Sequence, residues 1–570
     1  MTATKPAGSR QPIEGVGEPA QSSARATGVA THEVLNQPRE WGDVDLLASD
    51  PVLGSGIERE GADPDLIAEI ADFGRRVGRF ETFELGRLAN ENPPRLRTHD
   101  RYGRRIDEVE FHPAWHRLMA LGVEHEVHAL PWNRPGPGAH VARAAKHYLL
   151  TQAEAGVLCP LTMTFAAVPA LRAEPEVAAE WVPWITSKVY DFGLRPAAEK
   201  RGVIVGMAMT EKQGGSDVRA NTTRAVPTTE DGVYRLTGHK WFCSAPMSDA
   251  FLTLAQTDEG LSCFLVPRVL ADGELNTIFI QRLKDKLGNR SNASSEIEYR
   301  DTWAHRLGPE GRGVPTILEM VAHTRLDCML GSAGLMRQAL LRAVDHCRQR
   351  SAFGRPLIEQ PLMRNVLADL TLEWEAALTL ALRVARSYDG DPDDSANRAF
   401  RRLATALGKY WVCKRAPAMV CEALECHGGG GYVEESILPR IYREAPLSSI
   451  WEGSGNVMGL DVLRTLGRDP EAAEALRTEL DLARGADRRY DRHLDRVAGS
   501  LRHAEPWGAR RLAEQLALAL QASLLLRHAP HPVADAFCDS RLGDGPGHEY
   551  GTLAQGTDSQ AILDRVGYVG

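Results

Sequence analysis

The sequence lacks the marks of secreted, membrane-spanning and zinc-binding proteins. Its nine cysteines are scattered and form no Cys-x-x-Cys pair, which argues against a disulfide framework or a zinc site and favours a reducing compartment. The most apolar stretch, Ala155 to Leu171, is shorter than a bilayer span and contains Pro160 and Pro169, so we expect core helices there. The first thirty residues hold no apolar signal segment. We therefore expect a cytoplasmic chain without a metal site or a membrane anchor.

Positive charge is also in deficit. Lys and Arg number 67 against 76 Asp and Glu, so the formal net charge is -9. This balance argues against a surface that coats nucleic acid, although a local basic patch stays compatible with it. The chain of 570 residues is too long for one hydrophobic core, and we expect about three packed units.

The period of the apolar residues changes twice along the chain. It is helical from about Asp63, where Leu66, Ile67, Ile70 and Phe73 form one stripe. From Gly206 it gives way to short alternating runs between turn residues, typical of five or so antiparallel strands, and the helical period returns after residue 311. We therefore expect an α+β protein with these parts: 1–30, a disordered tail; 31–205, an N-terminal α-helical domain; 206–305, a small antiparallel β-barrel; 306–466, a C-terminal four-helix bundle; 467–540, a helical extension; and 541–570, a loose tail.

One loop separates the first helical part from the strands. In the stretch 208–220, Gly214 and Gly215 stand together, flanked by Thr210 and Ser216. Because glycine has no Cβ, the amides and hydroxyls of such a loop can approach a planar polar ligand closely. On these residues alone, an ordinary turn is the more common structure.

Two longer patterns resemble signatures of the acyl-CoA dehydrogenases. The first is Ala-Met-Thr-Glu-x-x-Gly-Gly-Ser-Asp-x-x-Ala, which begins at Ala208. The second begins at Glu425 as Glu-x-x-Gly-Gly-x-Gly-Tyr-x-x-Glu and is followed by Arg440 and Glu444. From about residue 31 to residue 540 the chain is similar to the AidB-like alkylation-response flavoproteins, a branch of that family. The motifs of this branch lie at 31–38, 84–90, 209–224, 284–293 and 448–456.

The resemblance implies an acyl-CoA dehydrogenase-like fold and a bound FAD. Such a fold has a helical domain, a small β-barrel and a four-helix bundle in this order. The residues implied to surround the flavin and its phosphates are Met207, Met209, Thr210, Gly214, Gly215 and Ser216 in the loop, Trp241, Phe242 and Cys243 in the β domain, and Ile450, Trp451, Gly453, Ser454, Gly455 and Asn456 in the part of the chain expected to form the bundle.

Glu452 is the candidate catalytic residue. It follows Ile450 and Trp451 and precedes a Gly-Ser-Gly turn, so partial desolvation could raise its pKa toward the range of a general base. On the residues alone, a solvated glutamate at a helix end is more common. Resemblance to the family's Ile-Tyr-Glu-Gly-Thr motif implies that Glu452 removes the α-proton of an acyl-CoA thioester while hydride passes to the flavin. Trp451 stands for the Tyr of that motif and Ser454 for its Thr, as in the AidB-like branch. The resemblance therefore does not define the shape of the acyl pocket.

Two further segments resemble contacts that this family makes between subunits. Arg350, Phe353 and Gln360 resemble a segment that reaches the adenine end of a neighbouring subunit's FAD. Gly428 and Gly429 resemble a loop whose amides meet the pyrophosphate, and amides at a Gly-rich helix start suit an anion. Such contacts imply a homotetramer.

The helical extension carries arginines four residues apart. Arg484, Arg488, Arg492 and Arg496 would form a basic stripe on one helix, to which Arg464 at the end of the bundle adds a charge. Acidic residues accompany the stripe, and from 469 to 540 twelve Asp and Glu outnumber ten Arg. A solvated, internally paired face is one interpretation. The other, implied by the resemblance, is binding of double-stranded DNA.

We therefore expect an FAD-dependent acyl-CoA dehydrogenase that acts on a short or branched acyl-CoA. The alternative is a DNA-binding flavoprotein of the DNA-alkylation response with weak or vestigial dehydrogenation. An acyl-CoA oxidase is a third reading, which differs in whether O₂ reaches the reduced flavin, and the sequence is silent on that.

Overall fold

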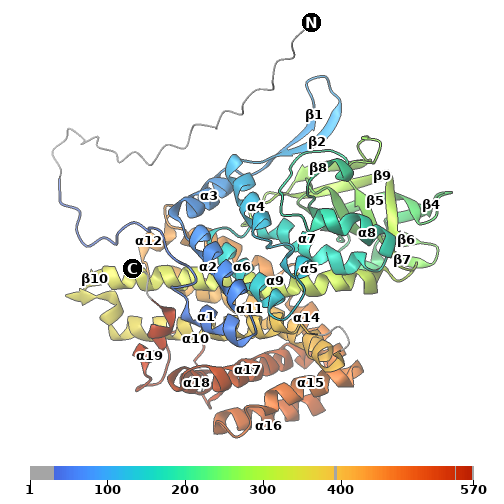
Figure 1. Cartoon of the computed structure of the whole chain (residues 1–570). Helices are drawn as coiled ribbons and strands as arrows, with labels where there is room; N and C mark the ends of the chain where they lie inside the picture. Colours follow the sequence, from blue (N-terminus) through green and yellow to red (C-terminus); the bar gives the residue numbers. More distant parts are fainter. Residues whose placement is uncertain (1–30, 391–393, 546, 568–570) are drawn as a thin grey trace. The chain divides into compact units, whose positions relative to one another are not determined.

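The helical period of the first part of the chain corresponds to helices in the computed structural model, which describes residues 31–390, 394–545 and 547–567 (Figure 1). The chain divides into two compact units, Met1–Gln37 and Pro38–Gly570. Residues 31–37 of the first unit contain no helix or strand. The predicted disordered tail, residues 1–30, lies outside the described residues. All elements below belong to the second unit.

The N-terminal helices form where caps and an apolar stripe coincide. In α2, for example, the Asp63 side chain accepts a hydrogen bond from the Leu66 amide at 2.8 Å, and Pro64 takes the first position. Leu66, Ile70 and Phe73 on one face are buried, as the periodicity predicts. The helices of this part are α1 (Pro51–Arg59), α2 (Pro64–Val77), α3 (Phe80–Glu91), α4 (Pro113–Glu124), α5 (Leu130–Asn133), α6 (Ala139–Ala153), α7 (Leu158–Leu171), α8 (Pro175–Ile185) and the 3₁₀ turn η1 (Ala197–Glu199).

A hairpin that the sequence analysis does not anticipate interrupts this helical part. Its strands are β1 (Arg95–His99) and β2 (Arg105–Glu110), which pair antiparallel. The Arg105 guanidinium donates to the Ile280 carbonyl at 2.7 Å, so the hairpin reaches the β domain. Its charged composition and short apolar alternation hid it in the sequence.

The middle part is a closed barrel, as predicted. Strands β6, β4, β5, β9 and β7 pair in that order, and β7 pairs back with β6. Two pairings differ from the prediction of an antiparallel sheet: β3 and β4 both pair with β6 in parallel, which the long connections between them permit. The predicted boundary at residue 305 falls inside β9. The strands are β3 (Val205–Ala208), β4 (Arg224–Pro227), β5 (Val233–Ser244), β6 (Ala250–Thr257), β7 (Gly260–Pro267), β8 (Ile278–Leu283) and β9 (Ser294–Leu307), with the turn η2 (Val218–Ala220).

Long helices return after β9 and build the predicted bundle. The longest, α9, has 37 residues and is therefore about 55 Å long. Its first residue packs so closely on β7 that a Cβ on Gly313 would lie 2.4 Å from the Ser262 carbonyl carbon, and Figure 1 shows its other end far from the barrel. The elements are α9 (Gly313–Gln349), β10 (Ser351–Ala352), β11 (Arg355–Pro356), η3 (Leu357–Glu359), α10 (Pro361–Arg386), α11 (Ser395–Glu425), α12 (Gly429–Tyr432), α13 (Leu438–Glu444), η4 (Leu447–Ser449) and α14 (Gly455–Arg468).

The predicted helical extension packs on this bundle through α17, which touches α10, α11 and α14. In α16, Tyr490, Leu494 and Val497 are buried as predicted, whereas Leu501 is 39% exposed. The elements are α15 (Pro470–Asp481), α16 (Arg488–Arg502), η5 (Pro506–Gly508), α17 (Ala509–His528), α18 (His531–Phe537), η6 (Cys538–Leu542), α19 (Ser559–Leu563) and η7 (Asp564–Val566).

The end of the chain is not the loose tail that the sequence predicts. Arg541 pairs with Asp369 and Glu373 of α10, and Arg565 pairs with Glu375 of the same helix at 2.7 Å. The apolar residues Leu553, Ile562, Leu563 and Val566 are buried. Buried acidic residues of α10 thus hold this segment in place. Its own apolar residues are too few to show the periodicity by which the sequence predicts helices.

Candidate functional site

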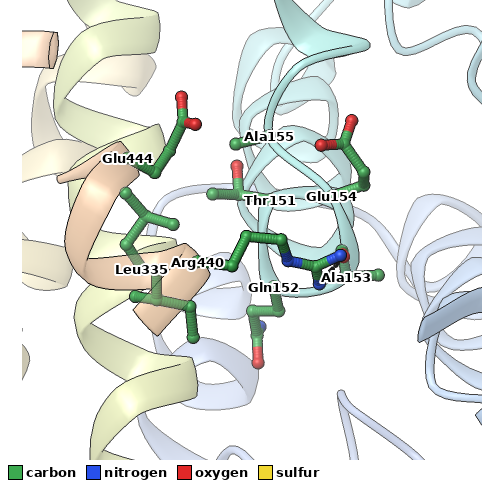
Figure 2. A pocket seen from close by; sticks show the side chains of 9 residues that line it. Thr151, Gln152, Ala153, Glu154, Ala155, Leu335, Arg440 and Glu444 are labelled. Atoms are coloured by element: carbon green, nitrogen blue, oxygen red, sulfur yellow. Dashed lines mark hydrogen bonds between the residues drawn. The ribbon is translucent and has the colours of Figure 1, made fainter. Parts of the chain in front are cut away.

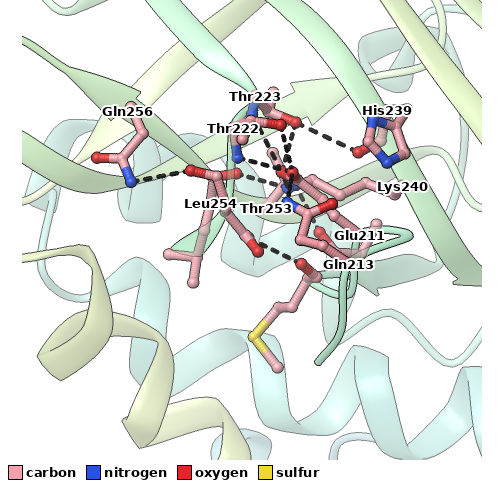
Figure 3. A network of polar contacts seen from close by, with 12 residues as sticks. Glu211, Gln213, Thr222, Thr223, His239, Lys240, Thr253, Leu254 and Gln256 are labelled. Carbon is pink, nitrogen blue, oxygen red and sulfur yellow. Dashed lines mark hydrogen bonds and ion pairs between the residues drawn. The ribbon is translucent and has the colours of Figure 1, made fainter. Parts of the chain in front are cut away.

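A buried ion pair shapes the loop between β3 and β4. Glu211 and Lys240 have no exposed side-chain surface, and Lys240 Nζ lies 2.8 Å from Glu211 Oε1. Glu211 also accepts from the Thr222 amide at 2.7 Å and from the Thr223 hydroxyl at 2.6 Å, as Figure 3 shows. Burial alone would raise the pKa of Glu211, but Lys240 and the threonine donors hold it well below its ordinary value. The loop therefore starts and ends on one ionised carboxylate.

The tip of this loop is open and demands glycine. Residues 212–217 are exposed, and nothing lies within 4 Å of a Cβ built on Gly214, whose φ is +140°. A Cβ on Gly215 would lie 2.5 Å from the Thr210 hydroxyl. The Thr210 carbonyl accepts from the Trp241 amide at 2.7 Å. The structure thus brings Thr210, Gly214, Gly215 and Ser216 into one accessible surface beside Trp241.

Trp241, Phe242 and Cys243 differ in what they can contact. Phe242 is 47% exposed, and the Lys284 ammonium lies 3.2 Å from the centre of the Trp241 ring, a favourable cation–π distance. Cys243 is fully buried in the core of the barrel, so its side chain packs within the wall. The position of the three residues behind a flavin stays a prediction.

A second apolar surface meets the loop from the bundle side. Met207 and Met209 are partly buried and pack against the same core cluster as Trp451. This cluster includes residues of α7, β3 and β6. The methionines that precede the loop and the tryptophan that precedes Glu452 therefore pack on one apolar cluster. Ile450, by contrast, is 63% exposed.

Glu452 lies in the turn between η4 and α14 with the left-handed φ of +56°. Its Oε2 accepts a hydrogen bond from the hydroxyl of Thr324 on α9 at 2.7 Å. Burial raises the pKa of Glu452 above its ordinary value, opposed by the Thr324 hydrogen bond and the charges of Arg325 and Lys409. A partly buried carboxylate with a raised pKa suits general-base chemistry. The Thr324 contact was missed in the sequence, where nothing links it to Glu452.

The turn after Glu452 opens α14. Ser454 holds the cap position without a side-chain hydrogen bond, so the first amides of the helix, at Gly455 and Asn456, keep their capacity for an anion. A Cβ on Gly455 would lie 2.7 Å from Cε of Lys414 and 3.6 Å from the guanidinium of Arg510. The cation on α17 was not anticipated, because the sequence places it in the extension.

The other predicted cofactor residues lie at the far end of the bundle. Phe353, at the tip of the β10–β11 hairpin, is 97% exposed with φ +52°, and Gln360 donates to the Ala352 carbonyl at 2.8 Å. Gly428, Gly429 and Gly430 are exposed with open space at each Cβ position. His427 stacks on His346 of α9, ring centres 4.5 Å apart, so the hairpin and the glycine loop are neighbours.

These two groups do not meet within one chain. Thr324, which touches Glu452, lies 25 residues before the end of α9, which corresponds to about 37 Å along the helix. Arg350 follows that end directly and leads into the hairpin. The structure therefore brings the loop residues, Trp241, Phe242 and Glu452 to one end of the bundle and Arg350, Phe353, Gln360, Gly428 and Gly429 to the other.

Two of the motif segments, 284–293 and the one that begins at Glu425, meet at a buried polar junction between the domains. Figure 2 shows Arg440 of α13 extended toward the end of α6, where it donates to a carbonyl at 2.8 Å. Glu444 accepts from the Asn289 side chain at 2.8 Å, and Glu154 accepts from Ser291 at 3.0 Å. The cavity among them is about 10 Å³, room for about one water molecule, so this junction is a structural contact.

The arginine stripe of the extension is largely paired. Arg484 lies 3.0 Å from Asp481 and Arg492 lies 3.3 Å from Asp544. Arg464 on α14 lies 3.7 Å from Asp461, and Arg496 donates to the Leu542 carbonyl at 2.9 Å. Arg488 lines an open, mixed-charge surface with Arg489, Asp491, Arg492 and Asp495.

The described part of the chain contains no cluster of three or more His, Cys, Asp or Glu residues suited to a metal ion. Among the helices that the structure describes, none has the length and apolar character to cross a bilayer.

Known proteins match nearly the whole chain. The profiles that match are the Adaptive response protein AidB N-terminal domain at residues 36–192, the acyl-CoA dehydrogenase middle domain at 206–302 and the acyl-CoA dehydrogenase C-terminal domain at 311–467. AidB of Escherichia coli (strain K12) is 49% identical over 516 residues, which are 90% of this chain and 94% of that protein.

Two solved structures share the fold with a TM-score of 0.79. The apo form of Bd2924 is 29% identical and the match covers 86% of this chain and 99% of that one. Caenorhabditis elegans ACDH-11 in complex with C11-CoA is 27% identical, with 95% and 94% covered. The chain therefore belongs to the acyl-CoA dehydrogenase family, a family of oxidoreductases, and within it to the AidB-like branch.

Proposed function

We propose that this protein binds FAD and catalyses the α,β-dehydrogenation of an acyl-CoA, with Glu452 as the base. The observation that carries the proposal is the partly buried Glu452 carboxylate, bonded to Thr324 at 2.7 Å and set beside an apolar surface that Trp451 shares with Met207 and Met209. Proton abstraction from a carbon acid requires a base with these properties. FAD is the cofactor of the acyl-CoA dehydrogenase family, to which the chain belongs.

The residues present fit a flavin nucleotide. The loop at Thr210, Gly214, Gly215 and Ser216 offers backbone amides without a side chain above Gly214, which suits the polar edge of a planar ring. The Trp451 indole N–H is buried without a partner in the described chain. The α14 start, with cations nearby, suits a phosphate.

Each part of the chain then has a defined task. Glu452 takes the proton from Cα on Oε1, the oxygen that Thr324 does not occupy, and Thr324 keeps the carboxylate oriented. The apolar cluster beneath Trp451 excludes water from the reacting carbons. FAD, when bound, supplies the acceptor for the hydride from Cβ, since no side chain can take up a hydride. The thioester becomes a 2-enoyl thioester.

We propose a short or branched acyl group. The hydroxyl of Thr162 on α7 donates to Asp327 of α9 at 2.5 Å, and Asp327 pairs with the buried Arg143. Asp327 follows Thr324 by about one helical turn, so α7 and α9 are tied together close to Glu452. This tie between the two helices supports a small acyl group in the proposal. The complex of the C. elegans relative with C11-CoA supports a thioester of coenzyme A as the class of substrate.

Anaerobic titration tests this function. The flavin-loaded protein is mixed with butyryl-, isobutyryl-, isovaleryl-, octanoyl- and palmitoyl-CoA, with free coenzyme A as the control, and the flavin absorbance is followed. We expect bleaching with the short and branched thioesters. Bleaching by none of them contradicts the function, and bleaching only by palmitoyl-CoA contradicts the substrate class. Admission of O₂ afterwards distinguishes a dehydrogenase from an oxidase by the rate of reoxidation.

The protein is proposed to act as a cytoplasmic homotetramer. The support for assembly is the distance between the two groups of cofactor residues on one chain, which a neighbouring chain would bridge. The support for a reducing compartment is that all nine cysteines are free and that eight of them are buried.

DNA binding in an alkylation response, with weak or vestigial dehydrogenation, is the second proposed function. The exposure of Arg488 and Arg492 on one face of α16 favours it. The ion pairs of Arg484 and Arg492 with Asp481 and Asp544 weaken it, because a paired arginine releases fewer counterions from a phosphate backbone.

A further inference from the structure

One buried cation holds the backbone on both sides of the proposed base. Nζ of Lys409 donates to the carbonyl of Trp451 at 2.8 Å and to the carbonyl of Gly453. Lys409 lies in the middle of α11 and is 1% exposed. In the described chain these two carbonyls are the hydrogen-bond acceptors of its ammonium. Burial of an ammonium that has only carbonyl partners costs free energy of folding. A function of Lys409 at this turn would explain why the protein bears that cost.

The carbonyl between these two is bound by a second cation. Nε of Arg325 donates to the carbonyl of Glu452 at 3.1 Å, and Asp461 fixes the same arginine at 2.9 Å. Three consecutive carbonyls therefore point at cations from two different helices, α9 and α11. The two residues they enclose have positive φ, +56° at Glu452 and +103° at Gly453. A non-glycine residue adopts this conformation only where its surroundings impose it.

We propose that Lys409 is a positioning residue for the reaction, which clamps the carbonyls of Trp451 and Gly453 so that the Glu452 carboxylate faces the α-carbon of the substrate. Arg325 completes the clamp from α9. This inference rests on the proposed role of Glu452 as the base. Lys409 does not touch the reacting atoms; it acts through the backbone of the turn.

The charge of Lys409 has a second effect, on the ionisation of the base. The charged and titratable groups that face Glu452 are Arg325 and Cys328 from α9, Lys409 from α11 and Cys159 from α7. Burial raises the pKa of the Cys159 thiol to about 12 and also raises that of Cys328, so both thiols stay neutral. The Thr324 hydrogen bond and the two cations are then what favours the carboxylate against burial.

Lys409→Met tests the clamp, because methionine keeps most of the length of the side chain and loses both hydrogen bonds and the charge. We expect the rate of flavin reduction at saturating acyl-CoA to fall about 10²-fold, the order that a misplaced catalytic group costs. Acyl-CoA affinity and flavin content should stay near wild type. The acidic limb of the pH–rate profile should move to higher pH, since the cation that favours the carboxylate is gone.

Lys146→Met is the matched control. Lys146 is a lysine of α6 that is also 1% exposed, and its partner Glu69 retains Arg134 at 2.6 Å. Its loss should leave the reduction rate and the pH profile unchanged. If Lys409→Met does not fold, Lys409→Gln retains a donor without the charge and should recover part of the rate while the limb stays shifted.

The outcomes separate this inference from the proposed function. If Glu452→Gln reduces the flavin at the wild-type rate, Glu452 is not the base, and both the proposed function of Glu452 and this inference are wrong. An inactive Glu452→Gln together with a Lys409→Met of normal rate and normal pH limb leaves the base in place and overturns only the clamp. If Lys409→Met and Lys146→Met lose equal amounts of the flavin-reduction rate and the acidic limb of the pH–rate profile does not shift, Lys409 contributes only to packing.

Discussion

The ammonium of Lys240 lies 2.8 Å from Oε1 of Glu211, and neither side chain reaches solvent. The same carboxylate binds Thr222 and Thr223, about a dozen residues later, while Lys240 also donates to the Leu254 carbonyl at 2.8 Å. One ion pair therefore joins β5 and β6 to both ends of the loop that carries the glycine pair. The accuracy with which that loop meets a ligand depends on a pair that no ligand touches.

Glu211→Gln should destabilise the protein, because it leaves the Lys240 charge buried without its counterion. Loss of one partner of a buried pair costs about 3–5 kcal/mol, which urea unfolding would measure. The double variant with Lys240→Met should be more stable than the single one, since no charge stays buried. Glu474→Gln, in the exposed pair with Arg477, is the control and should change little. A double variant no better than the single one would disprove the charge argument.

Glu452→Gln should retain flavin and lose acyl-CoA-dependent flavin reduction. Glutamine keeps the shape and one hydrogen bond from Thr324, but it cannot take a proton, and loss of a general base costs about 10²–10⁴-fold in rate. Anaerobic stopped-flow absorbance measures the rate, and the ratio of flavin to protein absorbance measures occupancy. A variant that reduces flavin at the normal rate would show that the base is another residue.

Thr324→Val should move the acidic limb of the pH–rate profile to higher pH. The base works only when ionised, so the rate falls as pH drops through its pKa. Burial already raises the pKa of Glu452, and the Thr324 hydrogen bond lowers it. Removal of that bond raises the pKa further, and the loss of rate therefore begins at a higher pH, while the plateau at alkaline pH is less affected. An unchanged limb would mean that another group titrates.

The sequence predicted the order of the domains because each period of apolar residues matches one kind of element. It failed where stability comes from distant polar partners. The final segment has few apolar residues, and only the structure shows Arg541 and Arg565 bound to the acids of α10. The β1–β2 hairpin is similar, since its Arg105 finds a partner carbonyl in β8.

For the candidate site, the sequence identified residues whose motif is continuous in the chain. Glu211 stood inside the first signature, yet its role depends on Lys240, 29 positions later. Thr324 and Lys409 lie on long helices where nothing local distinguishes them, and only the fold brings them to Glu452. Alternation along β5 sends the side chain of Cys243 into the barrel core, and its contact with the cofactor stays a prediction.

Gly429→Asp should abolish flavin retention if neighbouring chains share the cofactor site. The position is open at its Cβ, so the chain should fold, but the added charge repels a phosphate. Gly429→Ala, which fits the same space, is the control. Neither Gly429→Asp nor Glu452→Gln is expected to be active alone. Their coexpression should restore activity, because mixed assemblies contain sites with an intact loop from one chain and an intact base from the other. No rescue in verified mixed assemblies would place the whole site on one chain.

The proposed DNA contact is tested by charge reversal of Arg488 and Arg492 to Glu. Each phosphate that an arginine neutralises contributes about −0.9 to the slope of log K against log salt, so a stripe that meets several phosphates gives a steep slope on duplexes of any sequence. Arg492 must first leave Asp544, 3.3 Å away, and that competition makes the expected slope shallower than a count of arginines implies. The double reversal should weaken binding evenly across sequences and flatten the slope, with flavin content unchanged.

Reversal of Arg95 and Arg101, exposed on the β1–β2 hairpin, changes the net charge equally and should leave the slope intact. Equal effects of the two double variants mean that net charge, not this face of α16, governs binding, and absence of binding at low salt means that the stripe is a solvated helix face.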